Sequence, residues 1–156
     1  MTMEEYNKMY DVKKNIWCGP CKKNTPWCFL NKYNTPNYGH LYNKEQTFEC
    51  CNKHLIYLFK KVCVASERFN FKFFLDFGSI LGCLRNNRKI PYDVDIDFGI
   101  CREELRNFQK AMGFLCENGE KIIVKNKMIV YQLSKINNVH VDFFIYDKII
   151  KNGKEM

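Results

Sequence analysis

The stretch that most constrains this chain is residues 73–99, where an apolar run, a Gly-Ser pair and an acidic segment follow one another. In the acidic segment, apolar residues alternate with Asp93, Asp95 and Asp97. Alternation with a period of two is typical of a β-strand with one buried face, and it directs the three carboxylates to the same side. Like charges on one side of a strand repel each other, so we expect them to serve a cation.

A hard divalent cation suits this pattern. Mg²⁺ takes oxygen ligands and usually binds through one or two protein carboxylates plus substrate phosphates, so Asp95 and Asp97 are predicted to hold Mg²⁺ or Mn²⁺. Upstream, Gly78 and Ser79 stand between the apolar run and a short helical pattern. A strand, turn and helix start at that point would direct backbone N–H groups and a hydroxyl at a phosphate. The alternative is a solvated acidic edge that discourages strand pairing, and we favour the metal.

A second acidic position lies near the end of the chain. Residues 139–146 alternate so that Val139, Val141 and Phe143 share one face, while His140 and Asp142 share the other. A lone carboxylate among aromatic residues is costly to bury unless it is paired or bound to a metal, so Asp142 is predicted to be the third carboxylate of the site. His140 is interpreted as a neighbour of the site.

These residues carry a family resemblance. Gly78-Ser79, then Asp95-Ile96-Asp97, then a single Asp142 resemble the signature of the nucleotidyltransferase-β superfamily. The longer string, Gly-Ser-Ile-Leu-Gly-Cys-Leu-Arg followed by Ile-Pro-Tyr-Asp-Val-Asp-Ile-Asp, is similar to the LicD family of bacterial phosphocholine transferases and the fukutin group. Asn138–Phe144 and the Cys50-Cys51 pair bring it closest to the fukutin-related members. The resemblance covers roughly residues 17–153.

The resemblance implies an α+β fold, with a nucleotidyltransferase-like mixed β-sheet flanked by helices. It implies a Cys-rich, zinc-binding lead-in over residues 1–46 and a catalytic domain over residues 47–156. The implied activity is the metal-dependent transfer of ribitol phosphate or phosphocholine from a CDP-linked donor to a glycan hydroxyl, with release of CMP. The implied site residues are Asp95, Asp97 and Asp142 for the catalytic metal, Asp93 as a further catalytic group, and Gly78, Ser79 and Arg85 for the donor. Arg88 and Lys89 are interpreted as solvated.

Two other functions suit the same pattern: a catalytically silent binding module, and a nucleotidyltransferase that acts on nucleic acid or protein. The chain has 25 Lys and Arg against 17 Asp and Glu, for a net charge of +8, which favours anionic partners. The lysines are scattered and form no stripe, so we do not expect nucleic-acid binding.

The chain contains nine cysteines, and five of them lie between residues 18 and 51. Trp17-Cys18-Gly19-Pro20-Cys21 matches the thioredoxin active-site motif, but no buried strand precedes it, and Pro26 and Pro36 interrupt any long helix after it. A structural zinc site is the favoured reading, since zinc stabilises segments with little apolar surface to bury. By resemblance, the zinc ligands are Cys21, Cys28, Cys50 and Cys51, with Cys18 as an alternative.

The periodicity predicts a helix over residues 48–68 capped by Thr47, a strand over Phe71–Asp76, and a helix from Glu103 to Met112 that ends at Gly113. A hairpin is predicted from Lys121–Lys125 and Met128–Leu133. The sequence has no apolar run long enough to span a bilayer, and its first residues do not resemble a signal peptide. The resemblance implies the Golgi or secretory lumen, while the missing anchor leaves the cytoplasm open. The alcohol, the acceptor and the oligomeric state are left undetermined.

Overall fold

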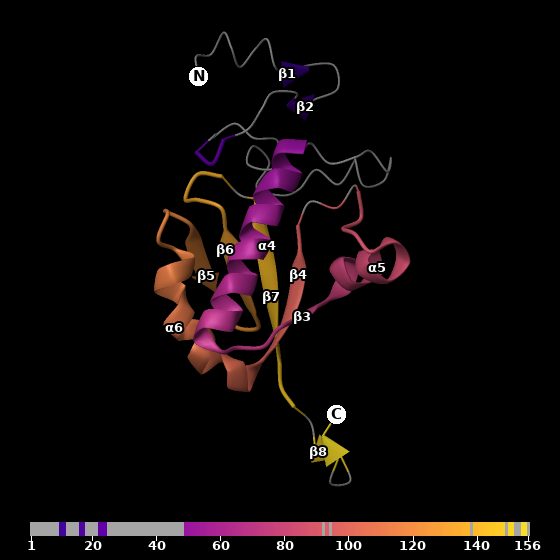
Figure 1. Ribbon diagram of the computed structural model, residues 1–156, viewed down its shortest axis with the longest axis vertical. Coiled ribbons are helices and arrows are strands. Elements are labelled where there is room, and N and C mark those ends of the chain that lie inside the picture. Colours follow the sequence, from indigo (N-terminus) through magenta and orange to yellow (C-terminus); the bar gives the residue numbers. More distant parts are fainter. Residues whose placement is uncertain are drawn as a thin grey trace.

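The computed structural model describes residues 10–11, 16–17, 22–24, 49–91, 93, 95–137, 139–148, 150–151 and 154–155. A five-stranded mixed sheet forms the centre, with helices packed beside it (Figure 1). The helices are α4 (Glu49–Phe69), α5 (Phe77–Asn86) and α6 (Leu105–Leu115), with a 3-10 turn over Arg102–Glu104. The strands of the sheet are β3 (Phe74–Leu75), β4 (Asp97–Cys101), β5 (Lys121–Val124), β6 (Met128–Gln132) and β7 (His140–Tyr146). The expected α+β fold with a mixed sheet is therefore confirmed.

The sheet has the strand order β3-β4-β7-β6-β5. Only β4 and β7 pair in parallel, while the other neighbours in this sheet are antiparallel. The parallel register sets Asp97 directly opposite Asp142. Two acidic residues from distant parts of the chain are thus held side by side by the main chain.

Two separate two-stranded ladders lie outside this sheet. β1 (Tyr10–Asp11) pairs with β2 (Ile16–Trp17), and β8 (Ile150–Lys151) pairs with β9 (Lys154–Glu155). Within the part of the chain that the structure describes, no helix combines the length and the apolar character needed to cross a bilayer.

The core lies between α4, α6 and one face of the sheet. Leu55, Leu58 and Val62 of α4 are fully buried, together with Phe98 of β4 and Phe143 of β7. Burial of these side chains is the main favourable term that holds α4 against the sheet. Asn70, with a φ of 52°, ends α4 in the left-handed conformation that commonly closes helices. The predicted helix over residues 48–68 agrees with α4 to within one residue at each end.

Three sequence predictions are wrong in extent. The strand predicted over Phe71–Asp76 is limited to Phe74–Leu75, because Asp76 already caps α5. The strand predicted over the acidic segment begins only at Asp97, because the chain turns before it: the Asp93 N–H donates to the Ile90 carbonyl oxygen over 3.0 Å. The helix predicted to end at Gly113 continues through Leu115, which is fully buried. Gly113 does not stop this helix, because burial of the next turn favours its continuation.

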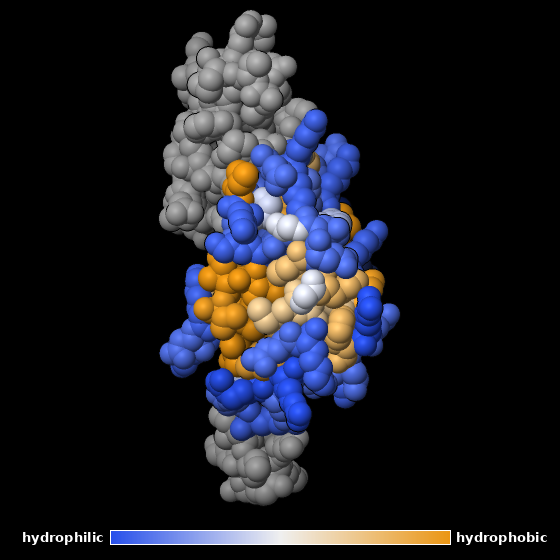
Figure 2. All heavy atoms as spheres, turned by 90° about the vertical axis from the view of Figure 1, so that its left-hand side faces the viewer, coloured by the Kyte–Doolittle hydropathy of each residue, from blue (hydrophilic) through white to orange (hydrophobic). Residues whose placement is uncertain are grey.

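Figure 2 shows the outer surface on the α6 and β5 side, where apolar side chains are framed by hydrophilic ones.

A buried ion-pair network joins residues 22–24 to the domain. The Glu120 carboxylate accepts a hydrogen bond from the Tyr57 hydroxyl at 2.5 Å and pairs with the ammonium groups of Lys23 at 2.5 Å and Lys61 at 3.2 Å. Burial by itself would raise the pKa of Glu120, but the hydrogen bonds from Lys23, Tyr57 and Lys61 outweigh it and lower the pKa to about 2. Ser134 also donates its hydroxyl to the Lys23 carbonyl oxygen. The tripeptide that follows Cys21 is therefore anchored to the domain through Glu120 and Ser134.

The predicted zinc site is covered only in part. Cys18, Cys21 and Cys28 lie outside the described residues. Cys51, at the start of α4, is 2% exposed and belongs to the apolar core, and Cys50 is half-buried beside it. The zinc site stays a prediction.

Candidate functional site

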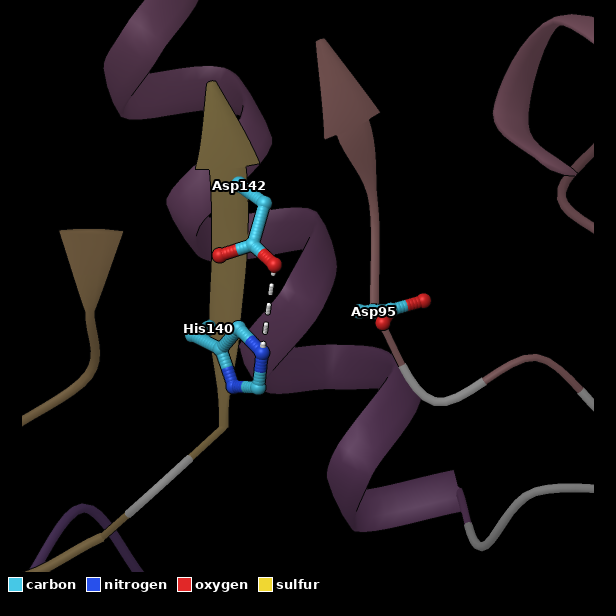
Figure 3. A group of neighbouring side chains, drawn as sticks. All are labelled: Asp95, His140 and Asp142. Atoms are coloured by element: carbon cyan, nitrogen blue, oxygen red, sulfur yellow. Dashed lines mark ion pairs between the residues drawn. The ribbon is translucent and has the colours of Figure 1, made fainter. Parts of the chain in front are cut away.

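The candidate site lies where β4 and β7 run in parallel, on the face of the sheet that α4 does not cover. Val141 and Phe143 are buried in the core, so the alternation of β7 turns His140 and Asp142 to the opposite face. Figure 3 shows these two side chains on the near face of β7, with α4 behind the strand. The alternation predicted for residues 139–146 agrees with this arrangement.

Three side chains come close enough to share an ion. Asp95, His140 and Asp142 each offer one ligand atom, and these atoms all lie within 4.8 Å of one another. His140 Nε2 lies 3.7 Å from Asp142 Oδ2, and Asp95 faces the pair from the loop that enters β4 (Figure 3). The main chain supports this approach, because the Asp142 N–H donates to the Ile96 carbonyl oxygen over 2.9 Å.

The environment of one atom in this group indicates a cation-binding site. Asp142 Oδ1 is buried and accepts no hydrogen bond from the described residues. A buried carboxylate oxygen without a donor is costly, and a metal ion satisfies it as well as a hydrogen bond does. The donor set of two carboxylates and one imidazole is one that divalent metals accept. The residues therefore fit the divalent ion that the sequence pattern predicts.

The carboxylates of the site repel one another. Burial raises the pKa of Asp97 to about 6, helped by the charges of Asp93, Asp142 and Asp76. Burial also raises the pKa of Asp95, with the charge of Asp97 as the next cause. The pKa of Asp142 is likewise raised by burial, against the opposing effect of His140 and Lys125. Each of these carboxyl groups is thus less stable in its charged form than in water, and a bound cation would reverse that.

Gly78 is required by a close approach. A Cβ atom at this position would lie 2.7 Å from Asp93 Oδ2 and 3.9 Å from Asp97 Oδ2. Real Cβ atoms do not come that close to a carboxylate oxygen, so any side chain here would displace Asp93. The absence of a side chain at Gly78 therefore lets the acidic loop lie against the first turn of α5.

The start of α5 is tied to β4 by the main chain of Asp97. The Asp97 N–H donates to the Ser79 hydroxyl oxygen over 2.8 Å, and the Asp97 carbonyl oxygen accepts the Asp76 N–H over 3.0 Å. Asp76 also caps α5 by accepting the Phe77 N–H with its side chain. Ser79 is buried, and its own N–H donates to the Asp76 carbonyl oxygen. Ser79 thus positions Asp97, and its predicted contact with a donor phosphate stays a prediction.

Arg85 lies at the opposite end of α5 from the Gly78-Ser79 turn, and its predicted contact with the donor stays a prediction. Arg85 lies in the last turn of α5, whereas Gly78 lies in the first. Seven residues of helix separate them by about 10 Å along the axis. Arg85 is exposed at that end of the helix.

Lys89 is placed differently from the solvated position that the sequence suggested. Its partly buried ammonium group donates to the carbonyl oxygens of Ile90, over 3.0 Å, and of Asp93. Burial lowers the pKa of Lys89, while the charges of Asp93 and Asp95 act in the opposite direction. Lys89 therefore holds the loop that carries the first two acidic residues. It also lines a cavity of about 520 Å³ between α4 and α5.

Three residues of this region were missed or undervalued by sequence reasoning. Asp76 precedes the Phe-Gly-Ser start of a helix, and an acid in that place is a recognisable N-cap signal. His140 shares its face with Asp142, which was visible in the alternation. Lys89 carried no signal, because its role depends on the path of the loop.

The chain is similar in sequence to known proteins. Residues 70–156 match the family model described as LicD/FKTN/FKRP, nucleotidyltransferase domain. The chain is 31% identical over 138 residues to the human protein named ribitol 5-phosphate transferase FKRP, and 30% identical to the mouse protein of the same name. Each alignment covers 82% of this chain and 27% of the relative. The chain therefore spans about a quarter of the length of these curated relatives.

Proposed function

The chain belongs to the LicD/FKTN/FKRP nucleotidyltransferase family, and we propose that it is a divalent-metal-dependent transferase of a phosphorylated alcohol. The proposed donor is a CDP-linked alcohol, with CDP-ribitol ahead of CDP-choline because the similar curated proteins are named ribitol 5-phosphate transferases. The proposed acceptor is a glycan hydroxyl, and the released product is CMP.

One observation carries this proposal: Asp97 and Asp142 stand opposite each other on parallel strands, and Asp95 reaches the same place from the adjoining loop. Three carboxylates at one point destabilise the protein unless something binds there. A diphosphate donor complexed with a divalent cation presents the complementary positive charge and requires oxygen ligands.

Asp95 and Asp142, whose ligand atoms lie within 4.8 Å of each other, would hold Mg²⁺ or Mn²⁺. Asp97, which the sequence also assigned to the metal, does not belong to this group and is proposed as the base instead. When bound, the cation would neutralise the charge that develops on the leaving CMP. The first turn of α5 borders this place at Gly78, and the positive end of the helix dipole there favours an anion. Lys89 stabilises the conformation of the acidic loop by donating hydrogen bonds to the Ile90 and Asp93 carbonyl oxygens.

In the proposed reaction, the acceptor hydroxyl oxygen forms a new bond to the phosphorus that carries the alcohol. The bond between that phosphorus and the bridging oxygen of CMP breaks, and CMP leaves with the electron pair. The hydroxyl proton goes to a carboxylate. Asp97, which stands opposite Asp142 on the neighbouring strand, is the carboxylate proposed to accept it. Asp93 lies close to Asp97; burial raises the pKa of Asp97, and the negative charge of Asp93 raises it further.

The experiment that tests this function uses mass spectrometry to measure CMP release from CDP-ribitol and CDP-choline, and pyrophosphate release from CTP, with Mn²⁺ or Mg²⁺ and a mixed oligosaccharide acceptor. We expect metal-dependent CMP release from a CDP-alcohol, and its loss in Asp142→Asn and Asp97→Asn. The matched control is Asp147→Asn, because Asp147 is an exposed carboxylate paired with Arg102 away from the cluster. Binding of CDP-ribitol without CMP release would instead identify a binding module, and turnover of CTP alone would identify a nucleotidyltransferase.

A further inference from the structure

We propose that His140 is a direct ligand of the catalytic cation, together with Asp95 and Asp142, and that its imidazole nitrogen makes the site prefer Mn²⁺ to Mg²⁺. The inference rests on the metal site of the proposed function and adds a ligand and a metal preference that the acidic motif does not contain.

The placement of His140 is the first argument. His140 opens β7 and stands two residues before Asp142, so both side chains project from the same face of one strand. Its Nε2 atom lies 3.7 Å from Asp142 Oδ2, which is longer than a hydrogen bond. Ligand atoms around an ion with bonds of about 2.1 Å stand roughly 3–4 Å apart, so this spacing is compatible with a shared ion.

Burial is the second argument. The side chains of His140 and Asp142 are only 23% and 14% exposed. Asp142 Oδ1 is buried without a hydrogen-bond donor among the described residues, so this oxygen is available to coordinate a metal ion. Figure 3 shows the imidazole and the Asp142 carboxylate next to each other on β7, with Asp95 across from them.

The charges around His140 define the rival role. Asp95, Asp97 and Asp142 all lie close enough for its charge to act on them, and Gln132 stands opposite it on β6. A protonated His140 would be a counter-ion for the carboxylates, and a neutral His140 would be a ligand, because coordination requires a free nitrogen lone pair. The two roles predict different responses to metals.

The donor set determines the metal preference. Mg²⁺ binds oxygen ligands in near-ideal octahedra and rarely accepts imidazole, whereas first-row transition ions bind imidazole readily. Mn²⁺ accepts carboxylates as well as imidazole nitrogen. One histidine among two aspartates therefore favours Mn²⁺, and loss of the histidine should remove that preference while leaving a Mg²⁺ site.

The test measures Mn²⁺ binding from the free-ion electron paramagnetic resonance signal, with Mg²⁺ as competitor. For the wild-type chain we expect Mn²⁺ to bind at least about tenfold more tightly than Mg²⁺. For His140→Gln we expect Mn²⁺ affinity to fall about ten- to a hundredfold and Mg²⁺ affinity to change less than about threefold. The matched control is His54→Gln, a histidine on α4 that should leave both affinities unchanged. His140→Asn serves as a second variant, and a thermal melt checks that each variant is folded.

A spectroscopic readout separates ligand from counter-ion. Electron spin echo modulation of bound Mn²⁺ should show coupling to an imidazole nitrogen in the wild-type chain and lose it in His140→Gln. Absence of nitrogen coupling in the wild type, or an equal fall in Mn²⁺ and Mg²⁺ affinity, would overturn the inference. Failure of the wild type to bind either metal would overturn the metal site as well. Selective Mn²⁺ binding without CMP release would refute only the proposed reaction.

Discussion

Replacing Asp97 with asparagine should make the metal-free protein more stable while it abolishes transfer. Asp97 lies opposite Asp142 and against Asp93, and its charge is disfavoured by burial and by these neighbours. Asparagine has nearly the same shape and no charge, and the main-chain bonds of Asp97 to Ser79 and Asp76 are retained. When a charged residue is retained for activity although its charge destabilises the fold, its neutral replacement should raise stability and lower activity.

The size of the effect follows from the pKa of Asp97, which is about 6 in the folded protein against 3.8 ordinarily. At about 1.4 kcal/mol per pH unit, the upper limit is about 3 kcal/mol. Asp97 is only half-buried, so solvent screening reduces this to about 1–2 kcal/mol, or a rise in Tm of about 3–6 °C.

The pH dependence has a definite sign. Below pH 3.8 this carboxyl is protonated in both states and contributes no penalty. Between pH 3.8 and about 6, the folded protein keeps a proton that the unfolded chain releases, so the free energy of unfolding falls as the pH rises. The advantage of Asp97→Asn should therefore be complete at pH 7.5 and smaller at pH 4.5.

Thermal melts in buffer stripped of metal ions, at pH 7.5 and pH 4.5, measure this difference. The control is Asp147→Asn, because Arg102 lowers the pKa of Asp147, and its removal should give no gain in stability at either pH. Saturating Mn²⁺ should raise the Tm of the wild type more than that of Asp97→Asn. A lower Tm for metal-free Asp97→Asn at pH 7.5, or a gain that does not change with pH, would refute the electrostatic account of the site.

Three further substitutions test other parts of the structure. Gly78→Ala places a Cβ atom 2.7 Å from Asp93 Oδ2, so we expect CMP release to slow by about tenfold or more, and an unchanged rate would show that Asp93 need not stay where it lies. Glu120→Gln removes the buried carboxylate that pairs with Lys23 and Lys61, while Lys61 keeps its longer pair with Glu117 at 3.5 Å. The free energy of urea unfolding at pH 7 should fall by about 2–4 kcal/mol, and this loss should narrow as the pH falls from 4.5 towards 2; equal unfolding midpoints at pH 7 would contradict it. Cys50→Ser should remove the proposed structural zinc and lower the Tm, and elemental analysis that finds no zinc in the wild-type chain would exclude that site.

Much of the candidate site was accessible from the sequence because spacing of two residues has a fixed meaning in a strand. The alternation around Asp142 predicted which face of β7 would be buried, and the family motif placed Asp95 and Asp97. The parallel pairing of β4 with β7 was not readable from the alternation, since it depends on how distant segments pack. That pairing is what brings Asp97 opposite Asp142.

The parts that the sequence did not predict are those set by tertiary contacts. The acidic segment begins as a turn and becomes a strand only later. The Ile90 carbonyl oxygen accepts hydrogen bonds from the Asp93 N–H and from the Lys89 ammonium group, and these bonds stabilise the turn. The sequence suggested that Ser79 binds a phosphate, but in the structure its hydroxyl oxygen accepts a hydrogen bond from the Asp97 main-chain N–H. His140 looked like a neighbour of the site until the structure set its ring beside two carboxylates.

The most direct measurement of the central claim is a crystal structure of the chain soaked in Mn²⁺, with anomalous diffraction that locates the ion. The account predicts a single strong anomalous peak within about 2.0–2.3 Å of carboxylate oxygens from both Asp95 and Asp142. A saturated crystal with no peak at those oxygens, or with a peak only elsewhere on the domain, would contradict it.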